Sequence, residues 1–182
     1  MLTQPGSQLF LTFAVAMCAT CGARTAATAQ QLAITSSAFN AGAAIPPAYS
    51  CDGADQSPAL SWSGMPPSTK SVALILDDPD APGGPWVHWV MYDLPADAMQ
   101  LPAGVAKTET LPNAAKQGLN DFRKIGYNGP CPPPGKPHHY TLRLYALDGP
   151  TGLPPRATKA QVLRAIEGHV LAQAELVGTY QH

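Results

Sequence analysis

The sequence predicts a mainly β fold, an antiparallel β-sandwich with a few peripheral helices. Three observations support this prediction. The chain has 20 prolines among its 182 residues, and proline cannot donate a hydrogen bond within a helix or a central strand. Its apolar segments are short and are separated by turn signals rich in glycine, proline and aspartate. Only one segment repeats its apolar residues with the period of a helix.

The predicted strands follow one another with turns between them. Ser71–Leu76 is a continuous apolar run, which is typical of a central strand buried on both faces. Alternating or short apolar segments predict the remaining strands. These cover Leu32–Ile34 with Phe39 nearby, Ser57–Trp62, Trp86–Leu94, Thr141–Leu147 and Ala174–Tyr180.

The single helical segment lies near the end of the chain. Thr158 is a suitable N-cap residue, and the periodicity predicts a helix from there through about Ala172. Its apolar face would consist of Ala160, Leu163, Ile166 and Val170. His169 falls within this segment and is interpreted as a packing or interface residue.

The organisation predicted is a signal peptide at residues 1–29 and a single domain at residues 30–182. Leu9–Ala19 is apolar, and Ala27-Thr28-Ala29 matches a small-residue cleavage site. The prediction is therefore a periplasmic or secreted protein, although the first eight residues contain no lysine or arginine. Cys18 and Cys21 leave lipoprotein export as an alternative, with poor matches to the required motif.

Removal of that leader leaves two cysteines, Cys51 and Cys131. An even count in an exported domain favours a disulfide between them. The alternative is a pair of free thiols near a binding pocket.

Composition excludes some functions. The net charge is −1, so no strongly basic face is expected for nucleic acid. The mature chain has no apolar run of the roughly 18 residues that a membrane-spanning helix needs.

Three clusters of unusual residues lie at strand ends or in loops: Asp78–Pro82, Trp86–Trp89 and Gly126–Tyr140. In order they read Asp-Pro-Asp-Ala-Pro, Trp-x-His-Trp and Gly-Tyr-x-Gly-Pro-Cys-Pro-Pro-x-Gly, followed by His-x-Tyr. This ordered set resembles the phosphatidylethanolamine-binding protein family, and the cysteine-bearing loop resembles its bacterial Raf kinase inhibitor-like branch. The resemblance covers nearly all of residues 30–182 and implies a β-sandwich with a small anion pocket at its surface.

The resemblance also implies which residues form the pocket. The ligand-binding positions are Asp78, Trp86, His88, Gly129, Pro133, His138 and Tyr140, with Asp80 and His139 as structural support. Imidazole and phenol groups donate hydrogen bonds to phosphoryl oxygens, and a loop glycine allows backbone N–H groups to approach an anion. Asp78 would orient a histidine or bond a protonated phosphate oxygen.

This sequence departs from the family pattern at His139, where the family usually has an arginine that pairs with the second acid, here Asp80. A histidine is a weaker and pH-dependent substitute, so the geometry of the pocket is put in doubt. The histidines and aspartates of the site are also metal-ligand types. Their spacing fits no standard zinc pattern, and the prediction names neither a metal nor a cofactor.

The function predicted is non-catalytic binding of a small phosphorylated or otherwise anionic ligand, such as phosphate or a phosphoethanolamine-like molecule. No Gly-x-Ser-x-Gly elbow is present. Two alternatives stay open: a regulator or inhibitor of an extracytoplasmic protein, and an acid/base enzyme on a phosphoester that uses Asp78 with His88 or His138. A homodimer is a further expectation from the resemblance.

Overall fold

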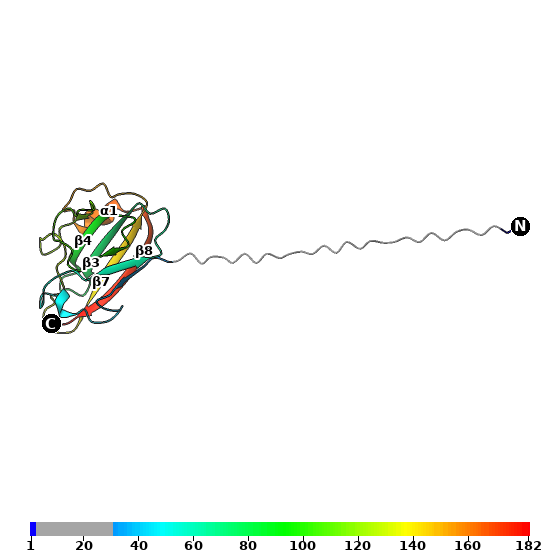
Figure 1. The fold of residues 1–182 in the computed structure, drawn as a ribbon. Coiled ribbons are helices and arrows are strands. Elements are labelled where there is room, and N and C mark those ends of the chain that lie inside the picture. The colour runs from blue at the N-terminus through cyan, green and yellow to red at the C-terminus, as the bar shows by residue number, and fades with distance from the viewer. Residues whose placement is uncertain (3–30) are drawn as a thin grey trace.

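Two antiparallel sheets make up the protein. The structure is a computed structural model, and it describes residues 31–182 together with the first two residues of the chain. One sheet has three strands in the order β1-β2-β5, and the other has five in the order β6-β4-β3-β7-β8. Figure 1 shows β4, β3, β7 and β8 of the larger sheet side by side. The strands are β1 Ala33–Ser36, β2 Leu60–Ser63, β3 Ser71–Asp78, β4 Trp86–Pro95, β5 Gln100–Leu101, β6 Lys116–Gln117, β7 His138–Leu147 and β8 Val170–Tyr180.

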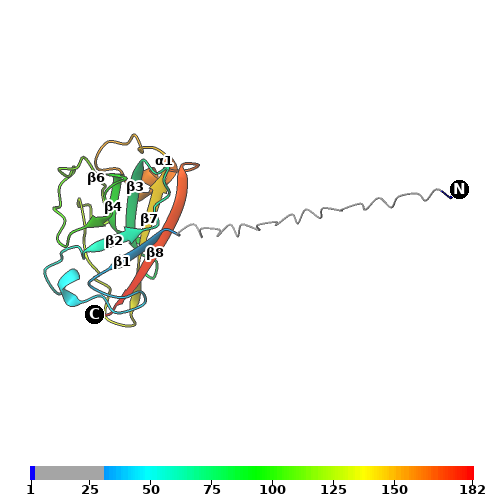
Figure 2. The ribbon, with the colours of Figure 1, turned by 45° about the vertical axis from the view of Figure 1, so that its right-hand side comes forward.

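The larger sheet is covered on both faces. On one face, the small sheet packs against it, with Ile34 and Trp62 meeting Leu74 and Leu142 in the main apolar core. Figure 2 shows β1 and β2 lying across this face. Burial on both sides explains why every residue of β3 is buried, because such strands carry continuous apolar runs rather than alternating ones. The prediction of a central strand at 71–76 is confirmed.

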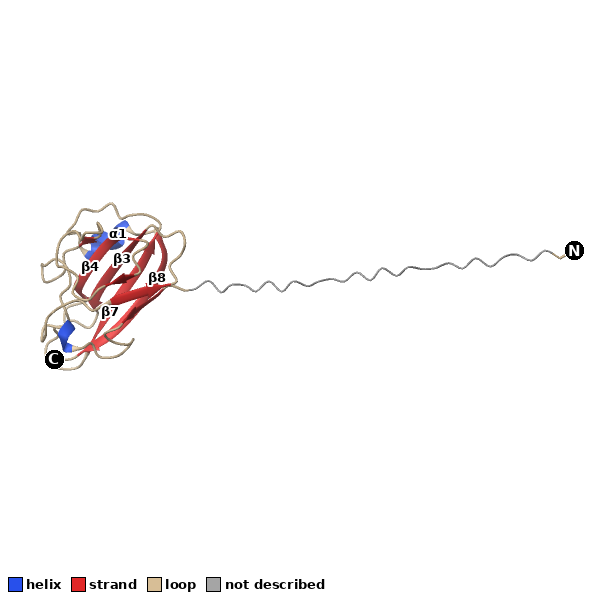
Figure 3. Cartoon of the chain, viewed as in Figure 1, coloured by secondary structure: helices blue, strands red, loops and turns tan. Residues whose placement is uncertain are grey.

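The opposite face of the larger sheet is covered by α1 (Lys159–Ala165) and the segment before it. Val162 and Ile166 pack there with Ile75 and Tyr92. Figure 3 shows how little of the described chain is helical. Apart from α1, the described residues hold only the short 3-10 helix η1 at Pro47–Tyr49. The mainly β prediction is therefore confirmed, with one α-helix in place of several.

The predicted helix was too long. Thr158 does cap α1, through a capping box with Gln161, but the helix ends at Ala165 and not near Ala172. Gly168 follows with a φ of 79°, a left-handed conformation that glycine adopts at helix ends. The chain then reverses and pairs with β7 from Val170 onward. His169 was wrongly assigned to the helix, and its Nδ1 lies 2.9 Å from Asp148 Oδ1 in the connection.

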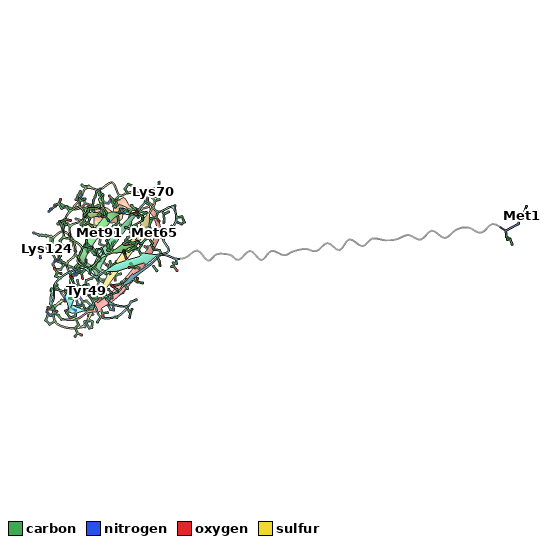
Figure 4. The ribbon with its side chains drawn as sticks, viewed as in Figure 1. Met1, Tyr49, Met65, Lys70, Met91 and Lys124 are labelled. Atoms are coloured by element: carbon green, nitrogen blue, oxygen red, sulfur yellow. A yellow bond between two sulfur atoms is a disulfide. The ribbon has the colours of Figure 1, made fainter. Side chains whose placement is uncertain are left out.

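Ion pairs fix α1 against the sheet. Lys159 of α1 and Arg143 of β7 both bind the carboxylate of Asp77, which is buried at the end of β3. Figure 4 shows the contrast between interior and surface, with Met91 within the body of the domain and Lys70 and Lys124 at its margin. No helix among the described residues is long and apolar enough to cross a membrane. The predicted signal peptide and the lipoprotein alternative lie outside the described residues.

Candidate functional site

A surface cavity of about 240 Å³ lies where three central strands meet. Because β3 runs antiparallel to both β4 and β7, the end of β3 lies beside the starts of the other two strands. Asp78 therefore meets His88 and His138, although up to 60 residues of sequence separate them. The cavity is lined by Asp78, Ala81, Pro82, Trp86, His88, Phe122, Cys131, Pro132, Pro133 and His138.

A β-bulge directs His88 toward the cavity. Leu76 pairs with Trp89 and Asp77 pairs with Val87, so β4 has one extra residue, His88, at this point. Such bulges redirect side chains next to functional sites. As a result, Trp89 lies in the core between the sheets and His88 also faces that side, where its ring meets Tyr140 edge-on at 5.2 Å.

His88 is held as a neutral donor and acceptor. Its Nδ1 lies 2.8 Å from the carbonyl oxygen of Asn128, and a carbonyl only accepts, so Nδ1 carries the proton. Burial lowers the pKa of His88, and this effect outweighs the opposing influence of the Asn128 carbonyl and of the Asp78 charge. In the neutral ring, Nε2 then carries a lone pair that is available to a ligand.

The Asp78 carboxylate is occupied at both oxygens. Oδ1 accepts the backbone N–H of Asp80 at 2.8 Å, and Oδ2 accepts Nδ1–H of His138 at 2.8 Å. Both side chains of the second pair are almost fully buried, with exposures of 6% and 4%. Asp78 therefore fixes the tautomer and the orientation of His138, leaving Nε2 of that ring for a ligand.

His139 takes the place of the arginine expected from the family pattern. The same oxygen of Asp80 accepts both the backbone N–H of His139 at 2.8 Å and its ring Nδ1–H at 2.7 Å. The backbone bond is the larger cause of the lowered pKa of Asp80, and the ring adds to it. Asp80 thus has a hydrogen-bond partner in His139. The main donor is the backbone N–H, which does not depend on pH.

Tyr140 lies behind the cavity and is not part of its wall. Its side chain is buried, with 1% exposure. Its hydroxyl has no hydrogen-bond partner among the described residues. Burial raises the pKa of Tyr140 far above its ordinary value, and the nearby Asp78 charge adds to this. A buried, unpartnered hydroxyl is uncommon and marks a position where a ligand or water would complete the bonding.

Phe122 is a cavity residue that sequence reasoning missed. Its ring meets Trp86 at 5.5 Å and His88 at 5.2 Å, both edge-on. The loop that carries it is fixed to β4 by the buried Asn120, whose side-chain N–H groups bond the carbonyl oxygens of His88 and Gly126. A lone phenylalanine in a polar loop gave no sequence signal, because its position depends on these tertiary bonds.

Only part of the loop 129–133 lines the cavity. Pro133 and Cys131 line the cavity, and Gly129 does not. The backbone N–H of Gly129, expected to face an anion, donates instead to Asp55 Oδ1 at 2.6 Å. A side chain at Gly129 would clash with the Tyr49 carbonyl, which lies 2.2 Å from the position of a Cβ atom. Gly129 is therefore a close-packing residue in this structure.

The two cysteines of the domain are adjacent. Cys51 and Cys131 have their sulfur atoms at bonding distance and their Cα atoms 5.4 Å apart, within the usual range for a disulfide. A bond between them attaches the loop 129–133, which carries Cys131, to the segment after η1, which carries Cys51. Among the described residues, the histidines and aspartates of the cavity do not gather closely enough to hold a metal ion.

Comparison with known proteins gives one consistent result. The family model for phosphatidylethanolamine-binding proteins matches residues 35–181. A UPF0098 protein of Methanothermobacter thermautotrophicus is 51% identical over 79% of this chain and 95% of its own length. A UPF0098 protein of Aquifex aeolicus is 43% identical over 81% of this chain and 87% of its own.

Solved structures agree with the sequence relatives. The homologue CT736 from Chlamydia trachomatis has a TM-score of 0.77 at 41% identity, covering 84% of this chain and 99% of its own. YbcL of E. coli, described as a member of the mammalian family, has a TM-score of 0.78 at 34% identity, with the same two coverages. The order of motifs, the double sheet and these matches agree: the chain belongs to the phosphatidylethanolamine-binding protein family.

Proposed function

We propose that the chain binds a small phosphorylated or otherwise anionic molecule in this cavity and does not convert it chemically. The supporting observation is the pair of imidazoles, His88 and His138, whose Nδ1 atoms are both engaged by the protein. Their remaining nitrogens suit the oxygens of a phosphoryl group. Tyr140 lies behind these rings, with its hydroxyl buried and without a hydrogen-bond partner among the described residues.

Binding without turnover is supported by how the reactive groups are held. Both oxygens of Asp78 are committed to protein donors, so it is poorly placed to act as a base. Cys131, the cysteine on the wall, faces Cys51 at bonding distance, and a disulfide sulfur is no thiolate nucleophile.

Proton uptake should accompany binding. Within residues 31–182, no lysine or arginine lines the cavity, so the anion's charge must be balanced by protonated imidazole or by a proton on the phosphate. Either way one more proton enters with the ligand. Affinity should therefore fall as pH rises above neutral, by up to about tenfold per unit.

Calorimetric titration of the full chain with inorganic phosphate and with phosphoethanolamine tests the proposal. One saturable site is expected in the wild type. Removal of either cavity histidine should weaken binding by roughly 10- to 100-fold, the scale of one charge-assisted hydrogen bond. The double variant His88→Ala and His138→Ala should show none, and the surface variant His169→Ala is the matched control. A folded wild type that binds neither ligand would overturn the proposal.

We also propose that the protein is exported. The leader at residues 1–29 and the cysteine pair at bonding distance support this, since disulfides persist in oxidising compartments. Fractionation of cells with mass spectrometry of the N-terminus is the test. A mature N-terminus at Gln30 is expected, an acylated Cys18 or Cys21 would indicate a lipoprotein, and an intact chain in the cytoplasm would contradict export.

A further inference from the structure

A second group of ligand-type side chains lies next to the cavity and shares Cys131 with its wall. Cys51, Cys131 and His182 each place one ligand atom so that all three atoms lie within 4.8 Å of one another. The carboxylate of Asp52 adjoins them, with Oδ1 at 3.1 Å from Nε2 of His182. We propose that these four side chains bind one zinc ion when the Cys51–Cys131 pair is reduced.

The donor set fits zinc. Two thiolates, an imidazole and a carboxylate are four ligands of the types that Zn²⁺ takes in tetrahedral sites. Zinc–sulfur bonds of about 2.3 Å hold two thiolates roughly 3.8 Å apart. The Cα atoms are 5.4 Å apart, so rotation of the two side chains suffices to open the sulfurs to that separation.

His182 is oriented for coordination through Nε2. Its Nδ1 lies 3.0 Å from the carbonyl oxygen of Pro132 and must therefore donate a proton. A neutral His182 then has its lone pair on Nε2, the atom that faces Asp52. Nitrogen and oxygen ligands of one tetrahedral zinc ion lie about 3.4 Å apart, close to the separation observed.

The surroundings of Asp52 leave one oxygen for the ion. Its Oδ2 accepts the hydroxyl of Tyr180, and that hydroxyl lies 2.8 Å from the buried Ser50 Oγ. The other oxygen, Oδ1, is the one that faces His182. Outer hydrogen bonds of this kind, on both the imidazole and the carboxylate, are typical of protein metal sites.

Oxidation state decides whether the site exists. In the disulfide, the two sulfurs are bonded to each other and supply no thiolate. A dithiol or phosphine reductant must provide two electrons, and two protons enter to give two thiols. A phosphine is itself oxidised to the phosphine oxide with an oxygen from water. Zinc then displaces the two thiol protons. Cys51, Cys131 and His182 are all exposed, so reductant and ion have direct access.

The test uses the full chain carrying Cys18→Ser and Cys21→Ser, so that every remaining thiol belongs to Cys51 and Cys131. It is reduced with a phosphine and titrated with Co²⁺, a spectroscopic probe for zinc. We expect one Co²⁺ per chain, intense visible bands of a tetrahedral ion, near-ultraviolet thiolate-to-metal charge transfer, and displacement by Zn²⁺. The same chain with its disulfide intact should show none of these signals.

Variants of His182 and Asp52 test whether these side chains bind the ion together with the two thiolates. His182→Gln and Asp52→Asn should each weaken Co²⁺ binding by at least about tenfold, the lower limit seen even for outer-shell changes. His169→Gln, on an exposed histidine elsewhere, should leave it unchanged. The proposal is overturned if the reduced, folded chain shows no charge-transfer band, if the oxidised chain binds equally, or if His182→Gln retains full affinity.

Discussion

The cysteine pair offers the largest single perturbation of stability that this structure predicts. Cys51 and Cys131 are separated by 80 residues, so their bond closes a loop that spans more than half of the described domain. In the loop-entropy model, such a cross-link lowers the entropy of the unfolded chain by about 15 cal/mol/K, which is about 4.5 kcal/mol at 25 °C. The double variant Cys51→Ser and Cys131→Ser should lose stability on this scale.

The assay is urea unfolding of the full chain, with thermal unfolding beside it. For a domain of this size, 4.5 kcal/mol corresponds to a decrease in the midpoint temperature of roughly 10–18 °C. Because the cross-link acts on the unfolded state, its removal should also increase the denaturant slope, since the unfolded chain expands and exposes more surface. Both cysteines are exposed, so the serines themselves should add little.

The matched control is the pair Cys18→Ser and Cys21→Ser, which should leave the free energy of unfolding of the domain unchanged. A loss below about 1 kcal/mol in the Cys51 and Cys131 variant, with an unchanged slope, would refute the reasoning. It would mean either that the bond does not form or that the unfolded chain is already compact without it.

Three further predictions concern the cavity and the loop beside it. Asp78→Asn should destabilise the fold by about 1–3 kcal/mol, because an amide N–H then faces Nδ1–H of His138. Nitrogen NMR should show that the proton of the His138 ring has moved to Nε2. An unchanged tautomer would contradict the role of Asp78 in fixing that ring. The lowered pKa of His88 means that the unfolded chain takes up a proton below about pH 6.5 and the folded chain only at lower pH. The free energy of unfolding should thus be highest above that pH and fall as the pH decreases toward the pKa of His88 in the folded chain. Denaturant titrations at several pH values should show a weaker dependence of this free energy on pH in His88→Gln. An equal dependence in both proteins would exclude His88 as its source. Gly129→Ala should cost about 1–3 kcal/mol through the clash with the Tyr49 carbonyl, and an equally stable variant would show that the loop moves aside freely.

The sequence was sufficient for those elements whose pattern is local. The run at 71–76 and the alternating segment at 141–147 became β3 and β7, because short apolar or alternating segments carry the strand signal within themselves. The helix was overextended because Val170 continues the helical spacing by chance. Its end was set by Gly168 and by the pairing of Val170 with Leu147, a contact between distant segments.

In the candidate site, too, residues in sequence motifs were predicted, and residues placed by contacts between distant segments were not. Asp78, His88 and His138 were found through motif order, and the structure brings them to one cavity. Phe122 and His182 were missed, since Asn120 fixes the loop that carries Phe122 and the Pro132 carbonyl holds the ring of His182, and both are tertiary contacts. Gly129 was predicted to let backbone N–H groups approach an anion, whereas in the structure its N–H bonds Asp55 and the Tyr49 carbonyl lies against it.

The cavity lies on β3, β4 and β7, and this position affects how the proposed ligand would enter and leave. These strands are the three inner strands of the larger sheet, whereas β6 and β8 form its edges. Fraying begins at edges, so amide hydrogens around Leu76 and Leu142 should exchange with solvent only when the whole domain unfolds. We therefore expect the rate at which the proposed ligand is released to depend on the loops at 81–85 and 130–134, and to be separable from the stability of the sheet beneath.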